Sequence, residues 1–174
     1  MQSLRSILRS GVCFKLLPLL LLATACVTRY GFAGGGLPPH IRTMAIEPFA
    51  NETPTAELQR ELLEAMHRNF QPRLGVRDAP QDRADALVRG IIRIYDVDIP
   101  STYAANQPVP TATRRRLQLV VDVAIVDQST GKTIFERKGL RAEGEYAEGD
   151  EVSGRRQAIK LIVNDMVEGA QSQW

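Results

Sequence analysis

Residues 117–125 of the chain, Leu-Gln-Leu-Val-Val-Asp-Val-Ala-Ile, decide its fold class. Every odd-numbered position of this stretch is apolar, whereas the polar residues Gln118 and Asp122 lie at even positions. Side chains of a β-strand alternate between its two faces, so the pattern predicts a strand with one buried face. The turn-forming residues 127–132 follow it and indicate a hairpin. We expect a second strand from Ile134 through Leu140.

A preceding apolar segment, residues 86–99, changes phase along its length. Its apolar positions form two sets of opposite parity, Val88, Ile92 and Ile94 in one and Tyr95, Val97 and Ile99 in the other. An unbroken strand would place one set in water, so we expect a β-bulge near Ile94 and Tyr95. Residues 100–113, which include Pro108 and Pro110, are expected to form the loop before the next strand.

Two amphipathic helices are expected on either side of these strands. The first covers residues 55–70, with a stripe of apolar residues four positions apart that we expect in the core: Leu58, Leu62, Met66 and Phe70. We expect Thr53 to cap this helix, Pro54 to occupy its first turn, and Gln71-Pro72 to end it. The second helix covers residues 152–170.

Further short segments complete the expected fold. Residues 41–49 are expected to form a first strand, residues 74–76 a short strand, and residues 143–149 a polar turn. The order of elements predicts one α+β domain over residues 40–174. It would hold a single antiparallel or mixed sheet of about four strands, with both helices packed on one face.

Residues 1–25 resemble an export signal. They contain Arg5, Arg9 and Lys15 but no acidic residue, and an apolar run over 16–23 follows. That run is shorter than the roughly 20 apolar residues needed to span a bilayer. It ends in Ala23-Thr24-Ala25-Cys26, which resembles a bacterial lipobox, so we expect cleavage before Cys26 and acylation of its thiol. The alternative is an ordinary cleavage site that leaves a free cysteine.

The residues after Cys26 indicate how the domain is attached and to which membrane. Residues 26–39 are rich in glycine and proline and are expected to be the lipidated cysteine and a short flexible tether. An aspartate directly after the lipidated cysteine would resemble an inner-membrane retention signal, but this position is occupied by Val27. We therefore expect a lipid-anchored protein on the outer membrane of a Gram-negative cell, facing the periplasm.

Charge and residue content argue against several classes of function. Without the three cations of the signal, 19 basic residues face 20 acidic ones, which disfavours nucleic-acid binding. The only histidines are His40 and His67, and neither belongs to a cluster with the spacing of metal ligands. No nucleophile elbow or phosphate loop is present. We therefore expect that the protein is not an enzyme and that it binds neither a metal ion nor a cofactor.

Three consecutive arginines, Arg114, Arg115 and Arg116, precede the cleanest strand. Guanidinium groups bind phosphates in forked contacts, and lipid A with its sugar core is the abundant phosphorylated ligand of the periplasm. These arginines are our candidate lipopolysaccharide contacts. The alternative is that charge at a strand end discourages edge pairing and aggregation.

Two motifs after the cysteine resemble a known family. They are Leu37-Pro38-Pro39-His40-Ile41-Arg42 and Ala45-Ile46-x-Pro48-Phe49-x-Asn51-x-Thr53. Both are similar to motifs of the lipopolysaccharide-assembly outer-membrane lipoproteins, although Arg42 stands where a lysine is usual. The specific match covers residues 26–53, and the rest agrees in length and order of elements.

The resemblance implies a protein without catalysis. It would plug the lumen of an outer-membrane β-barrel translocon protein, support assembly of that barrel, and contact lipopolysaccharide on its way to the outer leaflet. Lipoproteins of similar fold include subunits of export pores and activators of peptidoglycan synthases, and these functions are the alternative.

Overall fold

The computed structural model describes residues 37–100 and 114–172. The expected signal peptide, Cys26, most of the tether and the loop carrying Pro108 and Pro110 lie outside the described residues. The described elements are, in order, β1 (Thr43–Ile46), β2 (Ala50–Asn51), α2 (Glu57–Leu74), β3 (Arg77–Asp78), the 3-10 turn η2 (Gln81–Arg83), β4 (Ala86–Pro100), β5 (Arg114–Asp127), β6 (Thr133–Ala147) and α3 (Glu151–Ser172).

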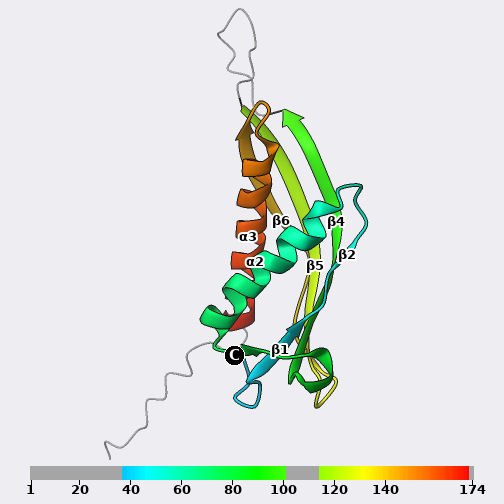
Figure 1. The fold of residues 1–174 in the computed structure, drawn as a ribbon, viewed down its shortest axis with the longest axis vertical. Coiled ribbons are helices and arrows are strands. Elements are labelled where there is room, and N and C mark those ends of the chain that lie inside the picture. The colour runs from blue at the N-terminus through cyan, green and yellow to red at the C-terminus, as the bar shows by residue number, and fades with distance from the viewer. Residues whose placement is uncertain (1–36, 101–113, 173–174) are drawn as a thin grey trace, which may run out of the picture. The chain divides into compact units, whose positions relative to one another are not determined.

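The strands form a six-stranded mixed sheet in the order β3-β1-β4-β5-β6, with β2 also beside β4 (Figure 1). β4, β5 and β6 are successive antiparallel strands, whereas β1 and β2 run parallel to β4 and β3 runs parallel to β1. The α+β class and the mixed sheet are confirmed. The expected number of about four strands is wrong, because the region expected to hold one strand over residues 41–49 holds β1 and the two-residue strand β2. The short strand expected over residues 74–76 is also misplaced, since α2 extends to Leu74 and β3 lies at Arg77–Asp78.

The expected break in β4 is confirmed one residue earlier than predicted. The register of β4 with β5 shifts between Ile92 and Ile94, so Arg93 is the inserted residue. After the shift Tyr95 packs against the core, and Ile94 is 39% exposed. The extra residue therefore turns Tyr95 inward, as the change of parity requires. Val97 of the same apolar set is nevertheless 41% exposed, and the register shifts a second time between Asp96 and Ile99.

β6 is longer than predicted and includes the segment expected to be a polar turn. It continues to Ala147, with Leu140, Ala142, Gly144 and Tyr146 alternating inward. Gly144 lies within β6 and not in a turn. A β-carbon at Gly144 would overlap the carbonyl group of Gly154 in α3, so the missing side chain lets the helix approach the strand.

Helix α2 buries the predicted stripe, but both of its ends differ from the prediction. It begins at Glu57, later than predicted, and its N-cap residue is Ala56, which has no side-chain acceptor. Thr53 therefore does not cap the helix, and its hydroxyl donates to the side-chain oxygen of Asn51. Pro72 lies inside the helix, where it removes only one hydrogen bond near the end. The helix ends at Gly75, whose φ of 70° is left-handed and whose N–H donates to the carbonyl of Gln71.

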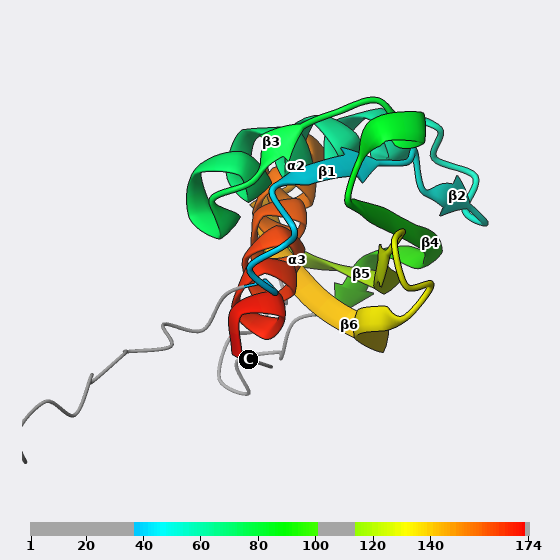
Figure 2. The ribbon, with the colours of Figure 1, turned by 90° about the horizontal axis from the view of Figure 1, so that it is seen from below.

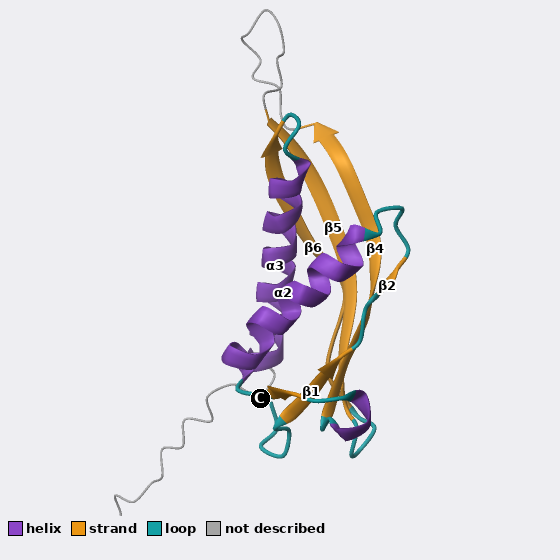
Figure 3. Ribbon diagram, in the orientation of Figure 1, coloured by secondary structure: helices purple, strands orange, loops and turns teal. Residues whose placement is uncertain are grey.

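Both helices lie on the same side of the sheet, and α2 crosses α3 (Figures 1, 2 and 3). α3 packs against β5 and β6, and one continuous core cluster joins the buried faces of both helices to the inward residues of the strands. No helix in the described part of the chain is long and apolar enough to cross a membrane.

Candidate functional site

The first family motif fastens the start of the domain to the far end of β5. The N–H of Ile41 donates to the carbonyl of Pro38 (2.9 Å), which forms a turn that buries Ile41, and Leu37 packs on the core. The Nε2 atom of His40 lies 2.9 Å from a carboxylate oxygen of Asp127. These residues therefore have structural roles, and His40 is a hydrogen-bond partner of Asp127 at the edge of the core.

Among the residues whose exposure the structure describes, Asp127 is the only buried charged one. Its carboxylate accepts hydrogen bonds from the hydroxyl of Ser129 (2.7 Å), the hydroxyl of Thr130 (2.8 Å) and the backbone N–H of Ser129 (2.8 Å). The Ser129 and Thr130 hydroxyls and His40 hold the pKa of Asp127 well below its usual value, against a smaller opposing effect of burial. The hairpin between β5 and β6 is thus closed around a fixed negative charge.

The second family motif builds the loop between β2 and α2. Phe49 is buried over Gly90, where any β-carbon would overlap its ring. The side-chain oxygen of Asn51 accepts from the N–H (3.0 Å) and the hydroxyl (2.8 Å) of Thr53, and its amide nitrogen donates to the carbonyl of Thr55 (2.8 Å). The motif therefore shapes the backbone that leads into α2.

The arginine run at the start of β5 faces carboxylates of β6 and the turn after it. Arg116 lies 3.2 Å from Glu143, Arg114 lies 3.6 Å from Glu145, and Arg115 lies 2.8 Å from Glu148. All three pairs join neighbouring antiparallel strands or the loop that follows β6. The run is therefore charge-balanced on the protein itself, an arrangement that also fits the alternative of a charged strand end.

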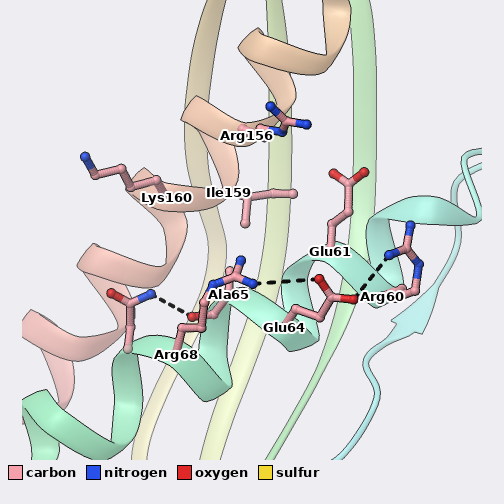
Figure 4. A pocket seen from close by; sticks show the side chains of 9 residues that line it. Arg60, Glu61, Glu64, Ala65, Arg68, Arg156, Ile159 and Lys160 are labelled. Atoms are coloured by element: carbon pink, nitrogen blue, oxygen red, sulfur yellow. Dashed lines mark hydrogen bonds and ion pairs between the residues drawn. The ribbon is translucent and has the colours of Figure 1, made fainter.

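Sequence reasoning missed a groove between α2 and α3. The groove has a volume of about 570 Å³, and most of its lining residues are labelled in Figure 4. Its floor is formed by Ala65 and Ile159, and its rim is polar. α2 contributes Arg60, Glu61, Glu64, Arg68 and Asn69 to the rim, and α3 contributes Arg156 and Lys160.

A forked ion pair beside the groove holds the two helices together. Arg155 of α3 donates from Nε and Nη2 to the two carboxylate oxygens of Glu61 in α2, at 3.0 Å each. This pair raises the pKa of Arg155 above its usual value. Glu151, 3.4 Å from Arg155, accepts a hydrogen bond from the hydroxyl of Tyr95 (2.5 Å). Burial is the larger cause that raises the pKa of Tyr95, and the hydrogen bond to the Glu151 carboxylate raises it further.

The remaining charges of the groove are not balanced. Arg60 and Arg68 share one carboxylate, that of Glu64, at 3.2 and 3.7 Å (Figure 4). Arg156 and Lys160 are exposed and have no carboxylate partner among residues 37–100 and 114–172. The groove therefore carries an excess of positive charge over an apolar floor. Only the pair Arg156 and Lys160, four residues apart on one helix, was a signal visible in the sequence.

The described residues contain no group of side chains able to hold a metal ion. His67 lies 3.1 Å from Asp78 on the surface, so each histidine lies beside one carboxylate.

A family model described as LptE, lipopolysaccharide-assembly, matches residues 41–172 of the chain. A search of curated proteins finds no match.

Solved structures share the fold at low sequence identity. A protein from Xanthomonas campestris is 12% identical, with 79% of this chain and 90% of that chain covered and a TM-score of 0.55. An uncharacterized lipoprotein B from Nitrosomonas europaea is 12% identical, with 80% and 86% covered and a TM-score of 0.51. The PelC dodecamer from Paraburkholderia phytofirmans is 14% identical, with 79% and 95% covered and a TM-score of 0.50.

Proposed function

Because the chain belongs to the lipopolysaccharide-assembly family, we propose that it plugs and helps assemble the β-barrel of the lipopolysaccharide translocon. In that position it contacts lipopolysaccharide as the lipid passes to the outer leaflet. The observation that carries this proposal is the family match over residues 41–172, which spans nearly all of the described domain. The family is not enzymatic, and we propose no catalytic role.

The proposed place of the protein is the periplasmic side of the outer membrane, with Cys26 as its anchor. We propose residues 1–25 as the signal, residues 26–39 as lipidated cysteine and tether, and residues 40–174 as the domain. The small residues before Cys26 and the absence of aspartate at Val27 support this arrangement. More than one acyl chain on Cys26 would hold the protein stably at the bilayer.

We keep Arg114, Arg115 and Arg116 as proposed lipopolysaccharide contacts, although each faces a carboxylate of the same protein. A phosphate group would have to displace those carboxylates or bind beside them. This requirement weakens the proposal for the arginine run but leaves the proposed role of the whole protein unchanged.

The alternative function is that of a subunit of an export pore or an activator of a peptidoglycan synthase. The fold shared with PelC, which its structure describes as a dodecamer, favours the ring-forming version of this alternative.

Affinity capture of the full chain from membranes in mild detergent tests the proposed function. We expect an outer-membrane β-barrel protein to co-purify in a one-to-one ratio. A homomeric ring without a barrel would support the export-pore alternative, and a peptidoglycan synthase without a barrel would support the activator. A Cys26→Ala variant serves as the control, because it removes the proposed anchor without changing the domain.

A further inference from the structure

The groove between α2 and α3 concentrates positive charge that the domain does not neutralise. Of its two acidic side chains, Glu61 is occupied by the forked contact of Arg155, and Glu64 is shared between Arg60 and Arg68. Arg156 and Lys160 add two further cations on the α3 side. Because the helices meet here, cations from residues 60–68 and 156–160 gather at one place.

This arrangement works against the stability of the isolated helix. Arg156 and Lys160 lie four positions apart, so they are neighbours on one helix face, and like charges at this spacing destabilise a helix. Local choices that oppose stability are expected at functional sites. An anion bound between the helices would relieve the repulsion of both pairs of cations.

The other lining groups indicate what kind of anion fits. Guanidinium and ammonium groups bind phosphoryl oxygens through charge-assisted hydrogen bonds. Glu64 and Asn69 add polar oxygens at the rim, which would repel a bare phosphate but accept hydrogen bonds from hydroxyl groups. A volume of about 570 Å³ is within the usual range for small-molecule sites and far exceeds the size of one phosphate ion.

We propose that the groove between α2 and α3 binds a phosphorylated saccharide, with Arg156 and Lys160 contacting phosphoryl oxygens and Glu64 and Asn69 contacting sugar hydroxyls. The apolar floor at Ala65 and Ile159 lies under the sugar ring. The identification of this saccharide as the sugar head of lipopolysaccharide rests on the proposed function. The inference that the groove binds a phosphorylated saccharide rests only on the residues of the groove.

A direct titration of the full lipidated chain in nonionic detergent tests this inference. The ligands are lipopolysaccharide, the same lipopolysaccharide after phosphatase treatment, the soluble probe glucosamine 1-phosphate, and inorganic phosphate. The test variant is Arg156→Gln with Lys160→Gln. The matched control is Lys132→Gln with Arg141→Gln, which removes the same charge from exposed residues outside the groove.

We expect the groove variant to bind lipopolysaccharide at least tenfold more weakly, and the control variant less than twofold more weakly. Phosphatase treatment should remove the difference between the two variants. Glu64→Gln keeps a side-chain oxygen that can accept from sugar hydroxyls but removes the negative charge beside the phosphoryl group, so it should tighten binding severalfold. Binding should also weaken as the salt concentration rises.

Equal losses in the groove and control variants would show a bulk charge effect and overturn the inference. Equal affinity of the intact chain for phosphatase-treated and untreated lipid would overturn phosphoryl recognition. Inorganic phosphate binding as tightly as glucosamine 1-phosphate would overturn the saccharide. Binding of glucosamine 1-phosphate in the groove without binding of lipopolysaccharide would support the groove and contradict only the proposed source. The titration needs no barrel, so its failure is distinguishable from failure of the capture experiment.

Discussion

Gly144 of β6 faces Gly154 of α3 with no side chain on either residue, and a β-carbon at Gly144 would overlap the carbonyl group of Gly154. The helix thus reaches the backbone of the strand at this crossing. The neighbouring ring of Tyr146 and side chain of Leu117 lie 2.9 and 3.2 Å from where a β-carbon of Gly154 would be. The contact between α3 and the sheet depends on this pair of glycines.

Gly144→Ala is expected to lower the free energy of unfolding by about 1–3 kcal/mol, because the added methyl group forces α3 away from β6. Chemical denaturation measures the change. Arg141→Ala, at an exposed position of the same strand, should change stability by less than about 0.5 kcal/mol. Equal stability of Gly144→Ala and the unsubstituted protein would show that the helix moves without cost.

Asp127→Asn is expected to make stability less dependent on pH in acid. The pKa of Asp127 is lowered in the folded protein by the Ser129 and Thr130 hydroxyls, so this carboxylate stabilises the fold above its unfolded pKa of about 3.9. Its contribution is lost as the pH falls below that value toward the folded pKa. Urea midpoints from pH 7 to pH 2 should therefore converge for the two proteins as the pH falls. Asp165→Asn, at an exposed position of α3, is the control and should keep the full acid dependence.

Asn51→Ala is expected to destabilise the domain by about 1–3 kcal/mol, because the loop before α2 loses its bridge between Thr53 and Thr55. Asn51→Asp keeps the oxygen that accepts from Thr53 but cannot donate to the carbonyl of Thr55, so its stability should be intermediate. Thermal unfolding of the three proteins checks this order, and a loss for Asn51→Asp as large as that for Asn51→Ala would contradict it.

Arg155→Met is expected to destabilise the domain by about 3 kcal/mol, because Glu61 would be left partly buried without its forked partner. Replacing both partners, as in Arg155→Met with Glu61→Leu, should recover most of the loss. Denaturation of both variants and of Glu61→Leu alone forms a double-mutant cycle. A coupling energy near zero would mean that the pair does not hold α2 against α3.

If Arg114–Arg116 contact lipopolysaccharide, Arg115→Glu with Arg116→Glu should weaken its binding. This variant should also lower stability, because the new carboxylates would face Glu148 and Glu143. Facing like charges on paired strands is destabilising. We therefore expect Arg115→Gln with Arg116→Gln to be more stable than the Glu pair, and lipopolysaccharide titration of the Gln pair to be the clean test of binding. Unchanged binding by the Gln pair would end the proposal for these arginines.

Secondary structure was predicted well where the periodic pattern is long and poorly where one residue has two possible roles. The stripe of α2 and the alternation of β5 have one physical reading, and both are buried as predicted. Gly144 and Pro72 are ordinary signals of a turn or a helix end. In this fold the missing side chain of Gly144 lets α3 pack closely against β6, and the strand continues through this position. Pro72 lies near the end of α2, where only one hydrogen bond is lost, and the helix continues past it.

For the candidate site too, the sequence identified short motifs, and the contacts between distant residues came from the structure. The two family motifs were identified from the sequence, but only the contacts of His40 and Asn51 show that these residues shape and fasten the backbone. The acids opposite Arg114–Arg116 follow them by about 30 positions, and the strand register that pairs them is a long-range property.

The sequence by itself determined the α+β class, the break in β4 and the membership of the family, because local periodicity and short motifs are properties of neighbouring residues. Only the tertiary structure decided which charges are neutralised and which are not. α2 and α3 are about 80 residues apart in the chain and meet through packing, so the cations at residues 60–68 and 156–160 form one groove only after folding. Electrostatic partners are set by distance in space, and distance in space is what the fold creates.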